Sequence, residues 1–300
     1  MMNITLSLAL LCTLLVASAH GSVIYTAYRN ATGQVTLGSL EPTTGKVTPA
    51  CDIPQPKGPY VYPGAYTTEM AYPTDADELA LVTITPSGGC IGASTVPFSP
   101  PDASVVLVAE PDNGAGRGSY LAINGSMVTF GSIDINAATL SPSGSMAVFS
   151  DAEIVSSTWD SVNNIFVLTD GVNMYRGSYP ARIYPMPEGM TVTALAFNWR
   201  NNGYYGIILP ATDADIAYIA QLKLSSPVKV TKVIELPGFG FGTECASAAT
   251  YDIPSGTMFS ACTTPGSGNM LIEASLSSST FTALPMPADA PLPLFMIAVR

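Results

Sequence analysis

Histidine is almost absent from this sequence. The 300-residue chain contains a single histidine, His20, which follows an apolar N-terminal segment. The rest of the protein therefore has no imidazole to act as a general base at neutral pH, to activate a serine or cysteine nucleophile, or to hold zinc. This absence excludes Ser-His-Asp and Cys-His catalysis and histidine-ligated metal sites.

Charged side chains are also scarce, at 11% of the residues, and acidic ones predominate. The chain has 22 acidic and 11 basic residues, for a formal net charge of −11. Lys229 and Lys232 are the only basic residues that form a cluster beyond the N-terminal segment. The sequence therefore predicts no nucleic-acid partner and no attraction to an anionic membrane. The many glycines and prolines favour short strands joined by tight turns.

Long apolar runs are missing beyond the N-terminal segment. Residues 4–16 are apolar, and Ala17-Ser18-Ala19 fits the small-residue cleavage pattern of a secretory signal. No later segment approaches the roughly 20 consecutive apolar residues of a membrane span. We therefore predict a signal peptide over 1–19 and a secreted, extracellular protein without a membrane span. Residues 20–300 are expected to form one domain.

Cysteine is rare, and four cysteines remain after the predicted signal: Cys51, Cys90, Cys245 and Cys262. An even number in a secreted chain predicts two disulfides. The segment 251–257 has the composition of a turn, and a hairpin folded about it places Cys245 nearly opposite Cys262. Cys51 would then pair with Cys90. Free buried thiols are the alternative.

A short motif, an apolar residue near a proline, recurs along the chain, and each copy is called a proline mark. Its prolines are Pro54, Pro97, Pro142, Pro185, Pro237 and Pro285, about 43 to 52 residues apart. Strand-like sequence fills the intervals. A period in the 40s with such sequence between the marks is typical of the blades of a β-propeller.

The two chain ends fit the same interpretation. Three strands are predicted before the first mark, over 23–28, 34–40 and 46–52, and the C-terminal residues 293–299 supply one more. Together they would make one four-stranded blade, which closes a ring by pairing the chain ends and leaves no open sheet edge.

This pattern of period and end closure resembles the six-bladed β-propeller superfamily across the whole mature chain. The resemblance implies an all-β propeller with six blades. Seven blades are the alternative, because residues 126–155 divide poorly into strands. The Asp-box of sialidases, the Tyr-Trp-Thr-Asp phrase of lipoprotein-receptor propellers and the WD-repeat signature are all absent, so no single family is indicated.

Polar residues recur where each innermost strand is expected to end. They are Asp112, Asp160, Asn198 and Asp252. A ring of these oxygen ligands at the channel mouth would suit a calcium ion, as in calcium-dependent lactonase propellers. In the alternative interpretation they begin turns by accepting hydrogen bonds from backbone N–H groups.

The loops that follow the proline marks carry aromatic and acidic residues. We predict a ligand-binding face from Tyr60, Tyr62, Tyr66, Glu188, Phe239, Phe241 and Glu244. Flat rings beside acids suit sugar stacking or peptide docking. The alternative is that the rings pack down over the proline corners and close the core.

The favoured function is a secreted, non-enzymatic propeller that binds a glycan or an extracellular protein. A calcium-dependent hydrolase of lactones or esters and a structural coat or matrix component are the alternatives. No catalytic residue is assigned, and calcium is the only cofactor considered. The sequons at Asn30 and Asn124 predict N-glycosylation of turn-like segments.

Overall fold

The computed structural model describes residues 23–55, 69–84, 90–97, 105–109, 117–125, 127–134, 137, 139–147, 154–177, 182–210, 216–240, 242–245, 249–252, 254–286 and 293–299. In these ranges the regular secondary structure consists of β-strands, which form six antiparallel sheets. The described part of the chain contains no helix long and apolar enough to cross a membrane.

The sheets of the N-terminal half follow the chain order, except that one of them includes the C-terminal strand. The first sheet consists of β24 (Phe295–Val299), β1 (Val23–Arg29), β2 (Val35–Glu41) and β3 (Lys46–Asp52). The next consists of β4 (Glu69–Pro73), β5 (Glu78–Ile84) and β6 (Cys90–Pro97). The third consists of β7 (Val105–Ala109), β8 (Arg117–Asn124), β9 (Met127–Asp134) and β10 (Thr139–Ala147).

The sheets of the C-terminal half are built in the same way. The fourth consists of β11 (Ser156–Asp160), β12 (Ile165–Thr169), β13 (Asn173–Gly177) and β14 (Arg182–Pro185). The fifth consists of β15 (Met190–Asn198), β16 (Gly203–Pro210), β17 (Tyr218–Lys223) and β18 (Lys229–Glu235). The sixth consists of β19 (Glu244–Cys245), β20 (Thr250–Asp252), β21 (Thr257–Thr264), β22 (Gly268–Ser275) and β23 (Thr280–Pro285).

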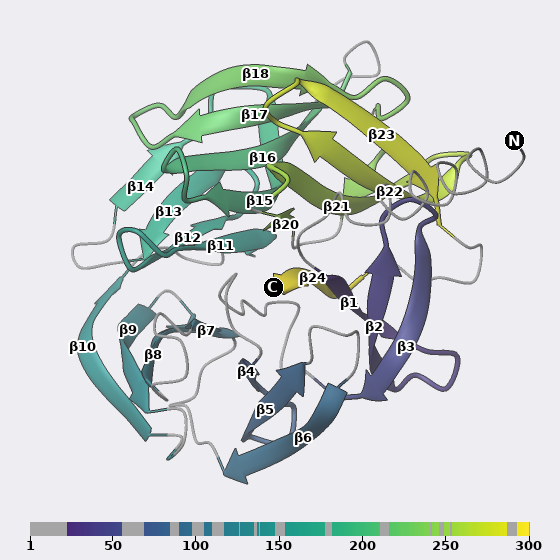
Figure 1. The fold of residues 1–300 in the computed structure, drawn as a ribbon. Coiled ribbons are helices and arrows are strands. Elements are labelled where there is room, and N and C mark those ends of the chain that lie inside the picture. The colour runs from purple at the N-terminus through teal and green to yellow at the C-terminus, as the bar shows by residue number, and fades with distance from the viewer. Residues whose placement is uncertain are drawn as a thin grey trace, which may run out of the picture.

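The sheets are arranged radially about a common centre, which makes the fold a β-propeller (Figure 1). The first strand of each sheet lies toward the centre and the last lies at the periphery. Innermost strands of neighbouring sheets contact one another, in the pairs β4 and β7, β11 and β15, β15 and β20, and β20 and β24. The predicted all-β propeller is therefore correct as a fold class.

The number of complete blades differs from the prediction. Five sheets contain at least four strands, whereas the sequence predicted six blades. The remaining sheet, β4 to β6, contains three strands within the described residues. The next strand in the described ranges, β7, pairs with β8 and so belongs to the following sheet.

The N-terminal strands lie within one residue of their predicted positions, and β1 pairs with the C-terminal strand β24. The register runs from Val23 opposite Val299 to Ala27 opposite Phe295. Each end of the chain thus contributes hydrogen bonds to the same sheet.

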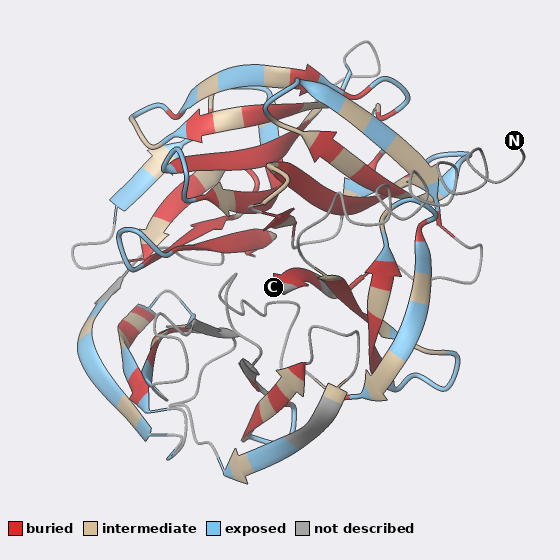
Figure 2. Cartoon of the chain, in the orientation of Figure 1, coloured by how far each residue is buried: buried red, intermediate tan, exposed pale blue. Residues whose placement is uncertain are grey.

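Burial follows the position of a strand in its sheet, and Figure 2 shows the buried residues concentrated on the inner strands. Every residue of β12 is buried, as expected for an apolar strand covered on both faces, and so is every residue of β11, although its sequence is Ser-Ser-Thr-Trp-Asp. The peripheral strand β18 is instead mostly exposed or half-buried. The continuous apolar runs of the sequence therefore mark the inner strands, and the mixed runs mark the rim.

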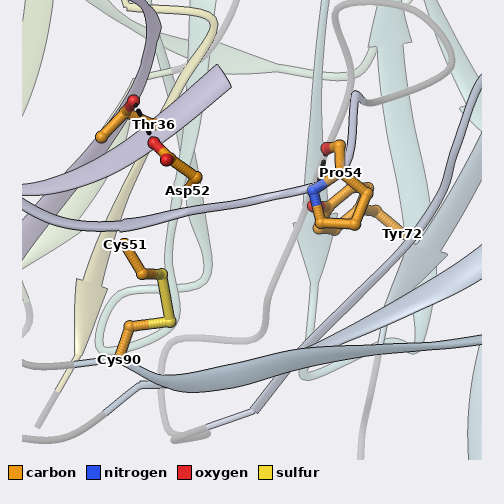
Figure 3. The surroundings of a disulfide bond; sticks show 6 residues. All are labelled: Thr36, Cys51, Asp52, Pro54, Tyr72 and Cys90. Atoms are coloured by element: carbon orange, nitrogen blue, oxygen red, sulfur yellow. Dashed lines mark hydrogen bonds between the residues drawn. A yellow bond between two sulfur atoms is a disulfide. The ribbon is translucent and has the colours of Figure 1, made fainter. Parts of the chain in front are cut away.

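Two disulfides join the four cysteines in the predicted pairs. Cys245 lies directly opposite Cys262 in the register of β19 and β21, and these residues are bonded. Cys51 of β3 is bonded to Cys90 of β6, which links the first sheet to its neighbour (Figure 3). Close by, the hydroxyl of Tyr72 in β4 donates a hydrogen bond of 2.9 Å to the carbonyl of Pro54, the first proline mark.

Candidate functional site

A pocket of about 320 Å³ lies between the third and fourth sheets. Strands β8, β9 and β10 contribute one wall, and β11, β12, β13 and the β11–β12 turn contribute the other. Three of its lining residues, Ser132, Ser143 and Asn164, are exposed, so the pocket reaches the protein surface. Its volume falls at the small end of the range for ligand sites.

Four aromatic rings line the pocket: Tyr120, Phe130, Trp159 and Phe166. The rings of Trp159 and Phe166 lie 4.6 Å apart with an interplanar angle of 57°. These two residues are directly opposite in the register of β11 and β12, which brings their side chains to one face of the sheet. The remaining lining residues are Ser119, Ser132, Ser143, Asn164, Gly131 and Gly177. None of these described lining residues is charged at neutral pH.

Two glycines permit close packing in the pocket walls. A Cβ atom on Gly177 would lie 2.5 Å from a methyl group of Leu121 in the facing sheet, so a larger residue there would force the two walls apart. One on Gly131 would lie 2.2 Å from the carbonyl oxygen of Ser141 in β10, so a larger residue there would separate β9 from β10 within one wall.

Two polar groups in the pocket have no hydrogen-bond partner. They are the hydroxyl of Tyr120 and the indole N–H of Trp159, whose side chains are 1% and 7% exposed. An unsatisfied buried donor costs about 1 to 3 kcal/mol. Burial raises the pKa of Tyr120, so its hydroxyl keeps its proton at neutral pH. Both donor atoms have almost no accessible surface, so they are buried among the residues of the pocket walls and remain unpaired there.

The second candidate site is the row of polar residues at the ends of the innermost strands. Asp160, at the end of β11, accepts hydrogen bonds at Oδ1 from the backbone N–H groups of Val162 (3.0 Å) and Asn163 (2.9 Å). At Oδ2 it accepts from Nδ2 of Asn163 (2.8 Å) and from the hydroxyl of Tyr204. Because Tyr204 belongs to β16 of the next sheet, Asp160 both forms its own turn and joins two blades.

The same position in the next two sheets holds Asn198 and Asp252. Asn198, at the end of β15, accepts a hydrogen bond of 3.0 Å from the backbone N–H of Arg200, and it is hydrogen-bonded to Tyr251 of β20. Asp252, at the end of β20, accepts the N–H and the hydroxyl of Ser255 at Oδ2. Its other oxygen, Oδ1, is buried without a partner. All three residues therefore support their turns, as the alternative interpretation predicts.

Calcium binding by this row stays a prediction. Asp112, its fourth member, lies outside the described residues. Within the described ranges, no group of three or more His, Cys, Asp or Glu side chains is placed to hold a metal ion. Among the three described members of the row, Asp252 supplies a carboxylate oxygen, Oδ1, that lacks a partner.

The residues predicted for the ligand-binding face are not brought together by the structure. Tyr60, Tyr62, Tyr66 and Phe241 lie outside the described residues. Phe239 is 4% exposed and packs in a core cluster, as the alternative for these rings predicts. Glu188, in the turn before β15, and Glu244, at the start of β19, are exposed.

Sequence reasoning missed the pocket residues Tyr120 and Trp159 as site candidates. Trp159 directly precedes the predicted site residue Asp160 in the phrase Thr-Trp-Asp, and Tyr120 begins the apolar run 120–123. The available signal was the rarity of tryptophan, since the chain has only two.

The two predicted glycosylation sites differ in environment. Asn124 is exposed at the β8–β9 hairpin. Asn30 is half-buried, and its Nδ2, the atom that would carry a glycan, donates a hydrogen bond of 3.2 Å to the hydroxyl of Thr36. Attachment at Asn30 would place a glycan on a half-buried nitrogen that already bonds Thr36, so the exposed Asn124 is the more accessible of the two.

No protein-family model matches this sequence, and no curated protein matches it either. Solved structures do resemble the fold. A structure of a nidogen/laminin complex has a TM-score of 0.53 at 12% identity, covering 93% of this chain and 98% of that one. A proposed 6-phosphogluconolactonase from Bacteroides uniformis gives 0.52 at 9% identity, with coverage of 93% and 99%. A protein from Lactobacillus plantarum gives 0.51 at 13% identity, with coverage of 93% and 99%. At these identities the likeness shows the β-propeller fold alone.

Proposed function

We propose that this chain is a secreted, non-enzymatic β-propeller that binds a glycan or another extracellular protein. The observation that carries the proposal is the uncharged, aromatic-lined pocket between the third and fourth sheets. Aromatic rings bury large apolar areas at a low entropic cost, and a few polar groups beside them orient a ligand. Asp160 supports the non-enzymatic part, because all its hydrogen bonds hold a turn or a neighbouring blade.

The finer features of the chain belong to the same proposal. Residues 1–19 are a signal peptide, residues 20–300 form one domain, and Asn30 and Asn124 are glycosylation sites. The three-stranded sheet is a sixth blade, and the sheet shared by β24 and β1 closes the ring. The two disulfides support secretion of the protein, because disulfides persist in oxidising compartments. A structural coat or matrix component is a variant of the proposal in which the protein binds other copies of itself.

The experiment uses the full chain, secreted from eukaryotic cells and labelled with biotin. It is applied to an array of glycans and to immobilised extracellular-matrix proteins. Ser143→Trp fills the mouth of the pocket from an exposed position, and Ser278→Trp is the matched control at an exposed turn between β22 and β23. We expect binding that Ser143→Trp reduces at least tenfold and that Ser278→Trp preserves. Binding that both variants retain would contradict the role of the pocket, and no binding at all would contradict the proposal.

One observation favours a second candidate, a calcium-dependent hydrolase of lactones or esters. The buried Oδ1 of Asp252 has no partner, and Asp160, Asn198 and Asp252 end three consecutive innermost strands that contact one another. The fold is similar both to that of a nidogen/laminin complex and to that of a proposed lactonase. The fold alone therefore does not distinguish a binding protein from a hydrolase.

Thermal melting in excess calcium and in EDTA tests the second candidate. A ligand at a hundredfold excess over its Kd stabilises the native state by about 2.7 kcal/mol. The hydrolase predicts a higher Tm in calcium that Asp252→Asn abolishes. Equal melting temperatures in calcium and EDTA would remove this candidate and leave the binding protein.

A further inference from the structure

Basic side chains from several strands lie at one end of the fourth and fifth sheets. Arg176 lies near the end of β13 and Arg182 begins β14, while Lys223 ends β17 and Lys229 begins β18. Arg200 lies in the turn between β15 and β16. Because the strands are antiparallel, all five positions are at the end of the two sheets at which the innermost strands β11 and β15 terminate.

Four of these residues form two like-charged pairs across neighbouring strands. Arg176 is directly opposite Arg182 in the register of β13 and β14, and Lys223 is directly opposite Lys229 in the register of β17 and β18. Like charges that face each other in this way destabilise a sheet. The paired strands of the two sheets are neighbours, because a backbone hydrogen bond of 2.8 Å links residue 228, just before β18, to residue 185, at the end of β14 (Figure 1).

Three other cations of the described sheets are each placed beside an acid. Lys46 is directly opposite Glu41 in the register of β2 and β3, and Arg117 is directly opposite Asp134 in that of β8 and β9. Lys232 of β18 forms an ion pair with a glutamate of the same strand. The two like-charged pairs are therefore an exception in a protein that has 22 acidic and 11 basic residues.

The described acids of the fourth and fifth sheets do not compensate for the two pairs. Asp160 is buried, and its carboxylate accepts hydrogen bonds from its own turn and from a tyrosine of the next blade. Asp170 and Glu188 lie in turns at the opposite end of the sheets. Glu235, the last residue of β18, is bound by Lys232. Within the described residues of these two sheets, positive charge therefore predominates at one end.

The two pairs point to a ligand with repeated negative groups. Arg182, Lys223 and Lys229 are exposed, and Arg176 is half-buried, with its Nε atom lacking a hydrogen-bond partner. A carboxylate or sulfate group between two facing cations would offset their repulsion and accept charge-assisted hydrogen bonds from them. Two such pairs on neighbouring sheets suit a polymer with several anionic groups better than a single small anion.

The turns beside the pairs favour a polysaccharide over a protein. They expose Ser161, Asn164 and Asn202, whose side chains can exchange hydrogen bonds with sugar hydroxyls. The large apolar residues exposed in these two turns are Val162 and Trp199. Protein interfaces have a core of apolar and aromatic residues from which charge is depleted, and two apolar side chains among cations do not make such a core.

We propose that the basic end of the fourth and fifth sheets, formed by Arg176, Arg182, Arg200, Lys223 and Lys229, binds an acidic extracellular glycan through its carboxylate or sulfate groups. This surface is separate from the pocket between the third and fourth sheets, so the inference goes beyond the proposed function. It shares with that function the expectation that the chain is secreted.

The test measures binding of the full secreted chain to immobilised heparin, a sulfated and carboxylated glycan. Poly-glutamate serves as an acidic polypeptide and dextran as a neutral polysaccharide. We expect saturable binding to heparin that weakens as sodium chloride is added, because salt screens exposed charges. Poly-glutamate should bind at least tenfold more weakly, and dextran should not bind.

A double variant, Arg182→Gln with Lys229→Gln, removes one exposed cation from each pair. The matched control, Lys46→Gln with Arg117→Gln, removes two exposed cations from other sheets and changes the net charge equally. We expect the first variant to weaken heparin binding at least tenfold and the control to change it less than twofold. Melting temperatures establish that both variants fold.

The outcomes also separate this inference from the proposed function. If heparin does not bind, or if the two double variants weaken binding equally, the basic end is not a specific site and the inference is wrong. Poly-glutamate binding as tight as that of heparin would assign the surface to an acidic protein instead. Ser143→Trp should leave heparin binding unchanged. A partner on the array that Ser143→Trp removes, without any binding to heparin, would uphold the proposed function and overturn only this inference.

Discussion

Two buried tyrosines differ in whether their hydroxyl groups are hydrogen-bonded, and this difference determines how much each hydroxyl contributes to stability. Tyr204 donates its hydroxyl proton to Asp160 across a blade boundary, whereas the hydroxyl of Tyr120 has no partner. Burial and the bond to Asp160 raise the pKa of Tyr204, which keeps the donor protonated. A buried hydroxyl contributes to stability only where it is paired.

The same substitution at these two sites therefore has different effects. Tyr204→Phe should lower the free energy of unfolding by about 1.5 to 3 kcal/mol, because it removes a hydrogen bond to a charged acceptor. Tyr120→Phe should leave stability unchanged or slightly raised, because it removes an unpaired donor. Urea denaturation of both variants measures the difference. Equal losses would mean that Tyr120 has a structural partner and would weaken the pocket as a ligand site.

Residue-level features were partly predictable from the sequence. Asp160, Asn198 and Asp252 were placed correctly at the ends of strands because Asp and Asn favour turns and each directly follows an aromatic residue. The pocket was not predictable, because Tyr120 and Trp159 belong to different sheets that only tertiary packing brings together. In the sequence, each of these aromatic residues is equally well explained as a buried core residue.

At the scale of elements, the five-residue strand β24 contributes to the contact between two sheets. It pairs with β1 and contacts β20, so it connects the first and last sheets of the chain. Ile297 in β24 is 4% exposed and packs in a cluster with Tyr25 and Ile53. Removing its side-chain atoms would leave a cavity at the junction of the two chain ends.

Ile297→Ala should destabilise the protein by about 2 to 5 kcal/mol, the usual cost of truncating a buried aliphatic residue. Ile183→Ala is the matched control, because Ile183 is 45% exposed on the peripheral strand β14. The control should change stability by less than about 0.5 kcal/mol. Thermal or urea unfolding of the two variants provides the comparison, and similar values would indicate that β24 is not a stable part of the sheet.

Elements were the best-predicted level because strand signals are local. The strands β1 to β3 and β24 were found from alternating or apolar runs bounded by turns and prolines. The disulfide Cys245–Cys262 followed from the same local reasoning, since one hairpin sets its register. The blade count was harder, because within the described residues β4, β5 and β6 form a sheet of three strands and β7 belongs to the next sheet.

At the scale of the whole molecule, the many buried tyrosines are expected to make the protein less stable at alkaline pH. Burial raises the pKa of Tyr28, Tyr72, Tyr120, Tyr175, Tyr204 and Tyr251 above the ordinary value of 10.0. Above that pH the unfolded chain loses these protons while the native protein keeps them. The unfolded state then binds fewer protons, so the free energy of unfolding falls as pH rises.

We therefore expect stability to be unaffected by tyrosine ionisation below about pH 9 and to fall steeply above about pH 10. Each fully protected tyrosine contributes up to about 1.4 kcal/mol per pH unit. Urea denaturation across this range, with tyrosinate absorbance as the probe of ionisation, measures the slope. Tyr204→Phe should reduce the slope, and a stability that is constant through pH 11 would contradict the burial of these hydroxyls.

The pairing of β1 with β24 also has a consequence for synthesis in the cell. β1 is synthesised long before β24, so the first sheet is incomplete until β24 has been made. Until then one edge of β1 lacks its neighbour, and such an edge can capture another strand. A chain terminated before β24 would keep that edge permanently.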